Sequence, residues 1–261
     1  MIFQIKTYLQ FLRKSSNQHG VHSPFVYDLV TQCFYDRQKH SAYKKLKNYR
    51  ESLLKNTHSI SVTDFGAGSK VFKSNQRQVN AIAKNAGISP KRAALLYRIT
   101  HYFKPTTMLE IGTSLGLATS ALHLGNPEAT LMTLEGCPNT LAVAKEHFQQ
   151  NGFALENISF INTEFAASLQ NPTITTQKFG LIYFDGNHSK QATLNYFNLL
   201  LPTITNDTVW IFDDIYWNQG MAEAWQEIKR DKNVTISIDT YQWGLVFFRK
   251  EQQKEHFTIR V

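Results

Sequence analysis

Apolar and polar positions alternate with a helical period over the first hundred residues. An apolar face recurs at steps of three and four along the first segment: Ile2, Ile5, Leu9 and Leu12. Further helices are predicted after Ser23-Pro24 and Ser89-Pro90, because serine caps a helix and proline suits its first turn. Another helix is predicted to begin at Ser74 and to end at Gly87. The pattern therefore predicts a helical region that contains no sheet.

From Thr106 the pattern changes to alternating strands and helices. The predicted strands are Met108–Ile111, Thr130–Leu134, Ile158–Ile161, Leu181–Phe184, Val209–Phe212, Val234–Ile238 and Leu245–Phe248. Only residues 239–244 separate the last two, which is too short for a crossover, so these strands should form an antiparallel hairpin. We predict an α/β fold with a seven-stranded, Rossmann-like, doubly wound sheet that ends in this hairpin. Residues 1–104 are predicted to be a helical, basic N-terminal region and residues 105–261 the main domain.

Composition indicates one substantial core, because the chain has 261 residues of which 42% are hydrophobic. Cys33 and Cys137 lie in unrelated contexts and make neither a disulfide framework nor a metal knuckle, which favours a reducing cytoplasm. No apolar run approaches the roughly 20 residues that span a bilayer. Lys6 interrupts the first apolar block, so a secretory signal is not expected. An organellar transit peptide is the minor alternative.

The net charge of +8 is distributed unevenly along the chain. Residues 1–109 hold 18 Lys and Arg against 4 Asp and Glu, whereas residues 110–261 hold 10 against 16. A basic N-terminal region suggests contact with an anionic surface or substrate. For the run RQKHSAYKKLKNYRESLLK alone, we favour the simpler interpretation that it is the solvated face of a helix.

Two glycine loops compete as the site of a nucleotide-type cofactor. Such a loop needs a strand ending in an acid, a helix opening at the last glycine, and a second strand ending in an acid roughly 20 residues later. The loop VTDFGAGSK, residues 62–70, lacks the second acid and is separated from the helix predicted at Ser74. We interpret it as a tight turn, the alternative being a lid in which Lys70 or Lys73 faces an anionic group.

The second loop, within MLEIGTSLGLATS, meets all three requirements. Its last glycine runs directly into an apolar helix, and the next strand delivers Glu135 25 residues after Glu110. A carboxylate at that place accepts two hydrogen bonds from a ribose diol. The helix N-terminus suits a carboxylate or phosphate. The predicted cofactor-binding residues are Glu110, Gly112, Thr113, Ser114, Gly116, Glu135 and Asp185.

Three carboxylates should meet at the carboxyl edge of the sheet, because the fourth and fifth strands end within YFDGNHSK and WIFDDIYW. They are Asp185, Asp213 and Asp214. Like charges brought together repel unless they are compensated, and Mg²⁺ or a related hard cation is their natural partner. The alternative is that Asp213 or Asp214 caps the following helix while Asp185 accepts backbone amides.

The motifs LEIGTSLG, LEG and FDGNHS…FDD resemble those of class I S-adenosyl-L-methionine-dependent methyltransferases, in particular small-molecule O-methyltransferases of the catechol/caffeoyl-CoA and macrocin type. The resemblance covers Thr106 to Lys250. HGVHSPF and DFGAGS also resemble the N-terminal region of uncharacterised, Bacteroidetes-type members. The resemblance to O-methyltransferases implies S-adenosylmethionine as cofactor and a divalent cation held by Asp185, Asp213 and Asp214. It also places a basic residue near the acceptor at His188, whose alternative role is an ordinary helix start.

These observations predict a cytoplasmic, metal-assisted O-methyltransferase for a small molecule, in which His188 and Asp185 are the catalytic residues. An Asn/Asp-Pro-Pro-aromatic run, usual in enzymes that methylate amines, is absent after the fourth strand, which favours oxygen as the acceptor. An aromatic acceptor could be walled by Tyr183, Tyr216, Trp217 and Trp243, although packing is the more common role. The alternatives are an RNA or protein acceptor recruited by the basic region, and a non-catalytic cofactor-binding protein. No membrane span is predicted, and the oligomeric state stays open, a homodimer being one option.

Overall fold

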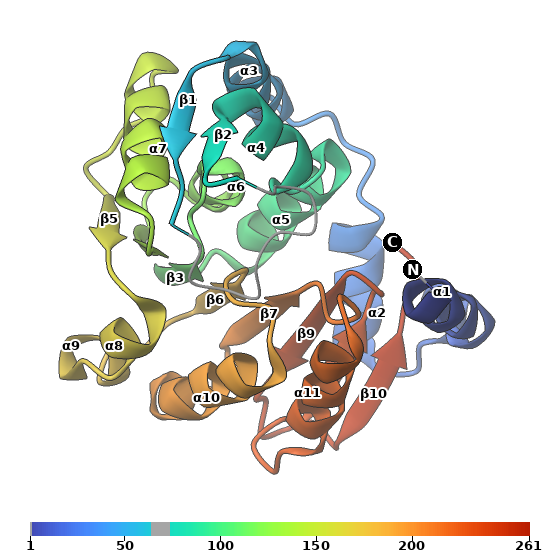
Figure 1. Ribbon diagram of the computed structural model, residues 1–261. Helices are drawn as coiled ribbons and strands as arrows, with labels where there is room; N and C mark the ends of the chain where they lie inside the picture. The colour runs from blue at the N-terminus through green and yellow to red at the C-terminus, as the bar shows by residue number, and fades with distance from the viewer. Residues whose placement is uncertain (1, 64–73) are drawn as a thin grey trace. The chain divides into compact units, whose positions relative to one another are not determined.

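The computed structural model describes residues 2–63 and 74–261 (Figure 1). The chain forms two compact units, one made of residues 1–36 and 166–261 and the other of residues 37–165. This division is interleaved along the chain and does not test the predicted boundary between residues 104 and 105. The whole DFGAGS segment, with Lys70 and Lys73, lies outside the described residues. No helix within the described ranges is long and apolar enough to cross a membrane.

The unit of residues 37–165 contains the first glycine-rich strand-to-helix turn of the sheet. Its elements are α3 (Ala42–Lys55), β1 (Ser59–Ser61), β2 (Gln76–Gln78), α4 (Val79–Asn85), α5 (Pro90–Phe103), β3 (Thr107–Ile111), α6 (Leu117–Gly125), β4 (Thr130–Glu135), α7 (Pro138–Gln150) and β5 (Ile158–Asn162). Strands β3, β4 and β5 are parallel, in that order. Their carboxyl ends therefore share one edge.

The other unit combines both ends of the chain. It holds α1 (Ile2–Lys14), η1 (Gln18–Gly20), α2 (Pro24–Asp28), η2 (Leu29–Phe34), α8 (Phe165–Leu169), α9 (Pro172–Thr175), β6 (Leu181–Phe184), α10 (Lys190–Leu200), η3 (Leu201–Thr203), β7 (Val209–Asp213), α11 (Gln219–Arg230), β8 (Ile236–Asp239), β9 (Trp243–Phe247) and β10 (Glu255–Thr258). The strand order is β10-β8-β9-β7-β6, and β9 is antiparallel to both of its neighbours. The predicted terminal hairpin is thus confirmed as β8 and β9.

The α/β fold with a mostly parallel main sheet is confirmed, but the sheet has eight strands where seven were predicted. The additional strand is β10, which pairs in parallel with β8 at the edge. It is short and half polar, so its sequence gives no clear strand pattern. Its neighbour Ile259 forms an isolated bridge with Ser16, which ties the two ends of the chain together.

The N-terminal helices are confirmed with two corrections. Ser23 and Ser89 accept hydrogen bonds from the amides of Val26 and Arg92, as expected of N-caps. The prediction of a helix beginning at Ser74 is wrong, because Gln76–Gln78 forms β2 and α4 begins only at Val79. The prediction of a region without a sheet is also wrong, since β1 and β2 pair antiparallel. One side chain of β1, Ile60, is buried, which gives this small hairpin an apolar contact.

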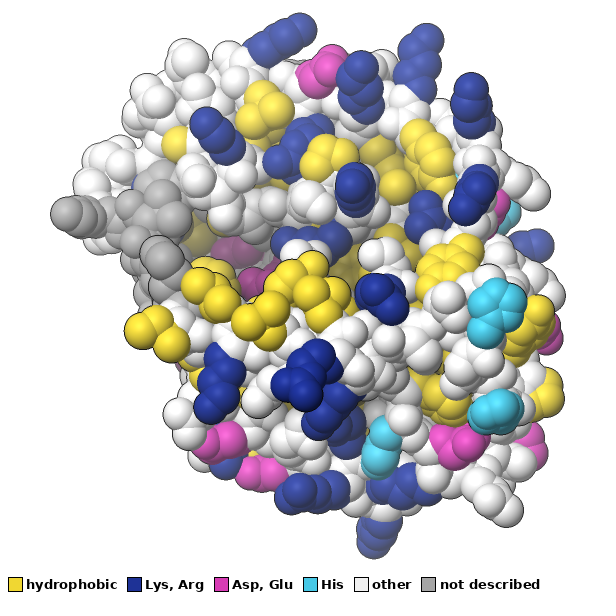
Figure 2. Space-filling model, turned by 90° about the vertical axis from the view of Figure 1, so that its right-hand side faces the viewer, with side chains coloured by type: hydrophobic (Ala, Val, Ile, Leu, Met, Phe, Trp, Pro, Cys, Tyr) yellow, Lys and Arg dark blue, Asp and Glu magenta, His cyan; other side chains and the backbone are white. Residues whose placement is uncertain are grey.

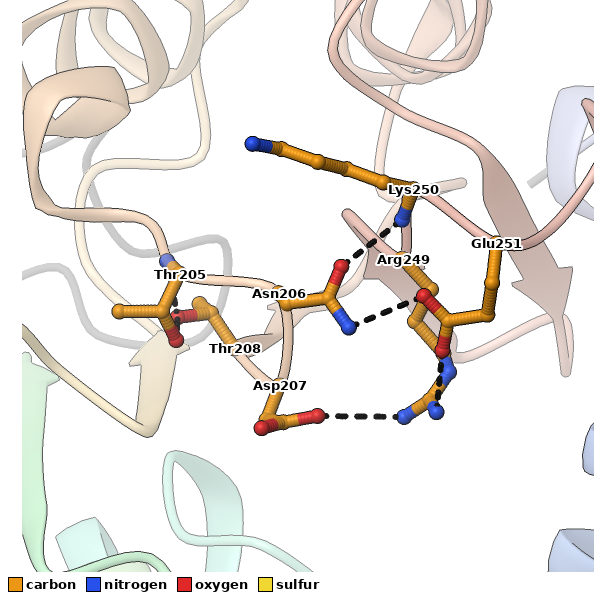
Figure 3. Close-up of polar contacts among 7 residues, drawn as sticks. All are labelled: Thr205, Asn206, Asp207, Thr208, Arg249, Lys250 and Glu251. Atoms are coloured by element: carbon orange, nitrogen blue, oxygen red, sulfur yellow. Dashed lines mark hydrogen bonds and ion pairs between the residues drawn. The ribbon is translucent and has the colours of Figure 1, made fainter.

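A network of polar contacts joins the turn before β7 to the segment after β9 (Figure 3). The Asn206 amide donates to the Glu251 carboxylate at 3.0 Å and accepts from the backbone amide of Lys250 at 2.9 Å. Arg249 forms ion pairs with both Asp207 and Glu251. These contacts hold the amino end of β7 against β9. The opposite end of β7 carries one of the predicted site carboxylates.

Candidate functional site

The loop after β3 is a series of left-handed backbone conformations. Gly112, Ser114 and Gly116 have φ values of 105°, 48° and 76°. At Gly116 glycine is required twice over, because a Cβ atom would lie 2.7 Å from the ring of Phe148 and the positive φ is strained for other residues. The amides of Gly112 and Thr113 both donate to the Leu134 carbonyl at 3.0 Å. The loop is therefore bound to the end of β4 by its own backbone.

A tyrosine of the basic N-terminal region forms a hydrogen bond to this loop. The hydroxyl of Tyr49 in α3 donates to the Leu115 carbonyl at 2.7 Å, and its side chain is fully buried. Burial, with the nearby Glu110 carboxyl, raises the pKa of Tyr49 well above its ordinary value. Sequence reasoning treated this helix as a solvated basic face and missed the role. The spacing of Leu46, Tyr49 and Leu53, all buried, is the signal that could have found it.

Glu135, at the end of β4, faces the loop. Its Oε2 accepts a hydrogen bond from the Ser114 amide at 2.7 Å, and its Oε1 accepts one from the Cys137 amide at 2.8 Å. Burial raises the pKa of this carboxyl, and the amides of Cys137 and Ser114 oppose that shift. A carboxylate has about four acceptor positions, so two amide donors leave room for further donors.

Glu110 lies behind the loop and is fully buried. Its Oε2 accepts hydrogen bonds from the hydroxyls of Thr119 and Thr133, both at 2.6 Å. The Thr133 hydroxyl has one proton and donates it to Glu110. The Thr113 hydroxyl must therefore be the donor in its hydrogen bond to Thr133. Within the described residues, Oε1 of Glu110 is buried without a hydrogen bond. Burial raises the pKa of Glu110 to about 8.

Six of the seven predicted cofactor-binding residues thus gather around one loop in one unit: Glu110, Gly112, Thr113, Ser114, Gly116 and Glu135. Glu110 and Thr113 form a buried network with the threonines, whereas Glu135 and Ser114 are only partly buried. Contact of these residues with a cofactor stays a prediction. The seventh, Asp185, belongs to the other unit.

In that unit, Asp185 and His188 follow the end of β6. The Asp185 Oδ1 and His188 Nε2 atoms lie 3.6 Å apart, and 18% and 24% of the two side chains are exposed. Asn218 donates to the His188 carbonyl at 3.1 Å. The Trp217 ring centroid is 6.2 Å from that of His188. The two predicted catalytic residues therefore form a half-buried acid–base pair with an aromatic ring beside it.

The local backbone explains how this pair is positioned. Asn187 is held at a φ of 53°, in the left-handed region that a non-glycine residue adopts at some energetic cost. Ser189 then caps α10, accepting a hydrogen bond from the Ala192 amide at 3.3 Å. The alternative reading of this segment as a helix start is thus also correct. His188 stands immediately before the cap.

Asp213 is the last residue of β7, and Asp214 follows it directly. Asp213 is buried, and its carboxylate accepts hydrogen bonds from the Tyr183 hydroxyl at 3.1 Å and from the Asp214 amide at 2.8 Å. No group of three His, Cys, Asp or Glu side chains that could hold a metal ion occurs among the described residues. A metal-binding role of Asp185, Asp213 and Asp214 therefore stays a prediction.

The four aromatic residues predicted as walls of an acceptor site have three different surroundings. Tyr183 and Trp243 are buried and pack edge to face with ring centroids 5.9 Å apart, so packing explains them. Tyr216 is half-buried and donates to Asp239 at 2.6 Å, a residue that sequence reasoning did not consider. Burial and the Asp239 carboxylate raise the pKa of Tyr216. Trp217 alone of the four lies beside the acid–base pair.

Comparison with known proteins places these features in a family context. Residues 109–215 match the family described as a methyltransferase domain. This segment begins in β3 and ends just after β7, so it includes the glycine loop, Glu135 and the Asp185–His188 pair. It omits the N-terminal helices and the terminal hairpin.

Several solved structures have a similar fold. The SAH-bound methyltransferase PaMTH1 of Podospora anserina is 15% identical, with a TM-score of 0.61 over 88% of this chain and 97% of its own. The Bacillus cereus O-methyltransferase in complex with SAH is 16% identical, with a TM-score of 0.57 over 84% and 96%. TomG of Streptomyces achromogenes, an O-methyltransferase of tomaymycin synthesis in complex with SAM, is 15% identical, with a TM-score of 0.56 over 84% and 95%. The predicted resemblance to class I methyltransferases is confirmed.

Proposed function

We propose that this chain is an S-adenosylmethionine-dependent methyltransferase that methylates an oxygen atom of a small molecule. The observation that carries the proposal is the methyltransferase-domain match over residues 109–215, because it includes both the glycine loop and the Asp185–His188 pair. The structural relatives include O-methyltransferases, two of them with SAH or SAM bound, which supports the choice of cofactor and of oxygen. The small-molecule acceptor is the expectation from the sequence motifs.

The loop of residues 112–116 and Glu135 would hold the cofactor. Glu135 suits a ribose diol, because its carboxylate already accepts two amides and has acceptor positions left for two hydroxyls. Gly112 suits close approach of a ligand to the backbone, since its φ of 105° disfavours any side chain. Glu110 would act indirectly, by fixing the loop through Thr133 and Thr113. The cofactor supplies a methyl group bound to a sulfonium sulfur.

The Asp185–His188 pair would move the acceptor's proton. With the Nε2 proton of His188 directed at Asp185, the basic nitrogen of the neutral ring is Nδ1. The acceptor hydroxyl would give its proton to that nitrogen while the methyl carbon exchanges its bond to sulfur for one to the acceptor oxygen, which leaves S-adenosylhomocysteine. Asp185 would stabilise the resulting imidazolium. The Trp217 ring supplies an apolar surface on which a planar acceptor could rest.

We derive no step through the predicted divalent cation, because the described residues contain no group of three His, Cys, Asp or Glu side chains that could hold a metal ion. Its test is separate from that of methyl transfer. Thermal unfolding would be followed with and without millimolar Mg²⁺ or Mn²⁺, in wild type and in Asp214→Ala. A cation-dependent rise in Tm that the substitution removes would restore the metal to the mechanism.

The first experiment measures SAH binding by calorimetry. Glu135→Ala should weaken binding by about 1.5–3 kcal/mol, the range for hydrogen bonds to a charged group. Glu146→Ala is the matched control, because Glu146 is exposed on α7 and accepts a hydrogen bond from its helix neighbour Gln150. Undiminished affinity in Glu135→Ala, or no binding by wild type, would contradict the assignment.

The second experiment identifies the acceptor class. Wild type and His188→Gln would be incubated with labelled S-adenosylmethionine and a set of phenols, catechols and aliphatic alcohols, with RNA and protein in parallel. We expect label in a small molecule and a large decrease of kcat in His188→Gln. Label in RNA or protein instead would contradict the small-molecule acceptor and favour recruitment by the basic N-terminal region. Cytoplasmic location, which we also propose, agrees with Cys33 and Cys137, which are both buried and are not joined in a disulfide.

A further inference from the structure

Helix α1 carries an apolar stripe that faces solvent. The stripe consists of Ile2, Ile5 and Leu9, which lie at steps of three and four and are 85%, 56% and 55% exposed. Together with Lys6, Gln10 and Arg13 they line a shallow groove along the helix. Single exposed apolar residues need no explanation, but an aligned set on one helix face marks an interaction surface.

The opposite face of α1 is fixed to its own unit. Phe11 is buried, and the Tyr241 hydroxyl donates to the Gln4 carbonyl at 2.7 Å. The rings of Tyr8 and Tyr241 meet edge to face with centroids 4.9 Å apart. The Gln4 side chain donates to the Trp217 carbonyl at 3.3 Å. These contacts fix α1 to its unit, so the stripe is exposed to solvent in the folded protein.

The border of the stripe is positively charged. Lys6 and Arg13 are exposed, and at 100° per residue both fall directly beside the stripe on one side. Lys14 ends the same helix, which contains no acidic residue. Figure 2 looks onto the side on which α1 lies in Figure 1 and shows a row of apolar side chains bordered by Lys and Arg. An apolar face with a cationic border is the pattern of helices that lie on anionic membranes.

A second copy of the chain suits this surface less well. Antiparallel pairing of two α1 helices through the stripe would bring the Lys6 side chains of the two copies toward each other, and like charges repel. A stable protein interface takes about 20–30 residues a side, far more than the three-residue stripe and its border. An anionic lipid surface needs no such area and complements both the stripe and its charge.

We propose that α1 docks the protein on an anionic lipid surface. Ile2, Ile5 and Leu9 enter the boundary between headgroups and acyl chains, while Lys6 and Arg13 meet the lipid phosphates. None of these α1 residues belongs to the glycine loop or to the Asp185–His188 pair. Docking does not rest on methyl transfer, so either proposal can fail without the other.

The test is flotation of the full-length chain, without an N-terminal tag, with phosphatidylcholine vesicles that contain either no phosphatidylglycerol or about 30% of it. Binding should occur only to the anionic vesicles and should weaken as salt screens the charges. Ile5→Gln/Leu9→Gln should reduce the bound fraction about tenfold or more, since it removes most of the apolar contact. Its Tm should stay unchanged, because both side chains are exposed.

A charge-matched pair of variants separates the α1 site from general electrostatics. Lys6→Glu/Arg13→Glu should abolish binding, whereas Lys84→Glu/Lys91→Glu, which makes the same change in net charge at exposed positions in the other unit, should retain most of it. Equal loss in both would overturn the proposal, as would unchanged binding of Ile5→Gln/Leu9→Gln. A dimer in light scattering that Ile5→Gln/Leu9→Gln dissociates would also overturn it, because a second copy would then cover the stripe.

Discussion

The buried carboxyl of Glu110 should make the stability of this protein depend on pH. Its pKa of about 8 in the folded protein exceeds the value of 4.5 expected when it is exposed. The folded state then holds a proton that the unfolded state releases between pH 4.5 and 8, so the free energy of unfolding falls as pH rises through this window and levels off above it. At about 1.4 kcal/mol per pH unit, the loss between pH 5 and pH 9 amounts to about 4 kcal/mol.

The assay is urea unfolding of wild type and Glu110→Gln at several values between pH 5 and pH 9. The variant cannot ionise there, so its curve should lack this loss, although its amide should cost about 1–3 kcal/mol at every pH because one donor is buried without a partner. His123 and His147, whose burial lowers their pKa, titrate alike in both proteins and cancel in the difference. Parallel curves for the two proteins would refute the reasoning.

Three further predictions concern the glycine loop. Gly116→Ala should lower the free energy of unfolding by about 1–3 kcal/mol, measured by urea unfolding, because it strains a left-handed residue and places a methyl group against Phe148. Tyr49→Phe should cost about 1–3 kcal/mol in the same assay, since it leaves the buried Leu115 carbonyl without its donor; an unchanged value would mean that the loop does not depend on α3. In hydrogen exchange, the two amides that donate to Glu135 should be slowed by SAH, and faster exchange would mean that the ligand displaces them.

The fold could be predicted where the sequence pattern is compatible with only one arrangement of the strands. The terminal hairpin followed from the short connection between its strands, and its register, with Asp239 opposite Gly244, leaves only a tight turn between them. Strand β2 could not be predicted in this way, because Gln76, Arg77 and Gln78 have no apolar alternation. It exists because its backbone pairs with β1, and only Ile60 of that strand is buried.

The position of the loop was predictable from its glycines, but the partners of its carboxylates were not. Glu110 meets Thr133 because the two stand opposite each other in the β3–β4 register, which the sequence does not specify. In the same way, Asp213 receives the Tyr183 hydroxyl across β6 and β7. The metal prediction placed Asp213 at the sheet edge, but the sequence did not indicate that its carboxylate accepts a hydrogen bond from Tyr183. Pairing register, more than residue type, decides which partners these acids have.

The two glutamates that flank the loop show how environment divides the work between identical side chains. Glu110 has no exposed surface, and its carboxyl accepts hydrogen bonds from two threonine hydroxyls. It can therefore stabilise the loop but cannot contact a ligand. Glu135 is held by two backbone amides, one to each oxygen, and each oxygen can accept a second donor. A ribose diol could thus be bound without breaking either amide contact. We therefore expect a ligand to strengthen a loop geometry that already exists, because the residues that shape the loop are not the ones that must change partners.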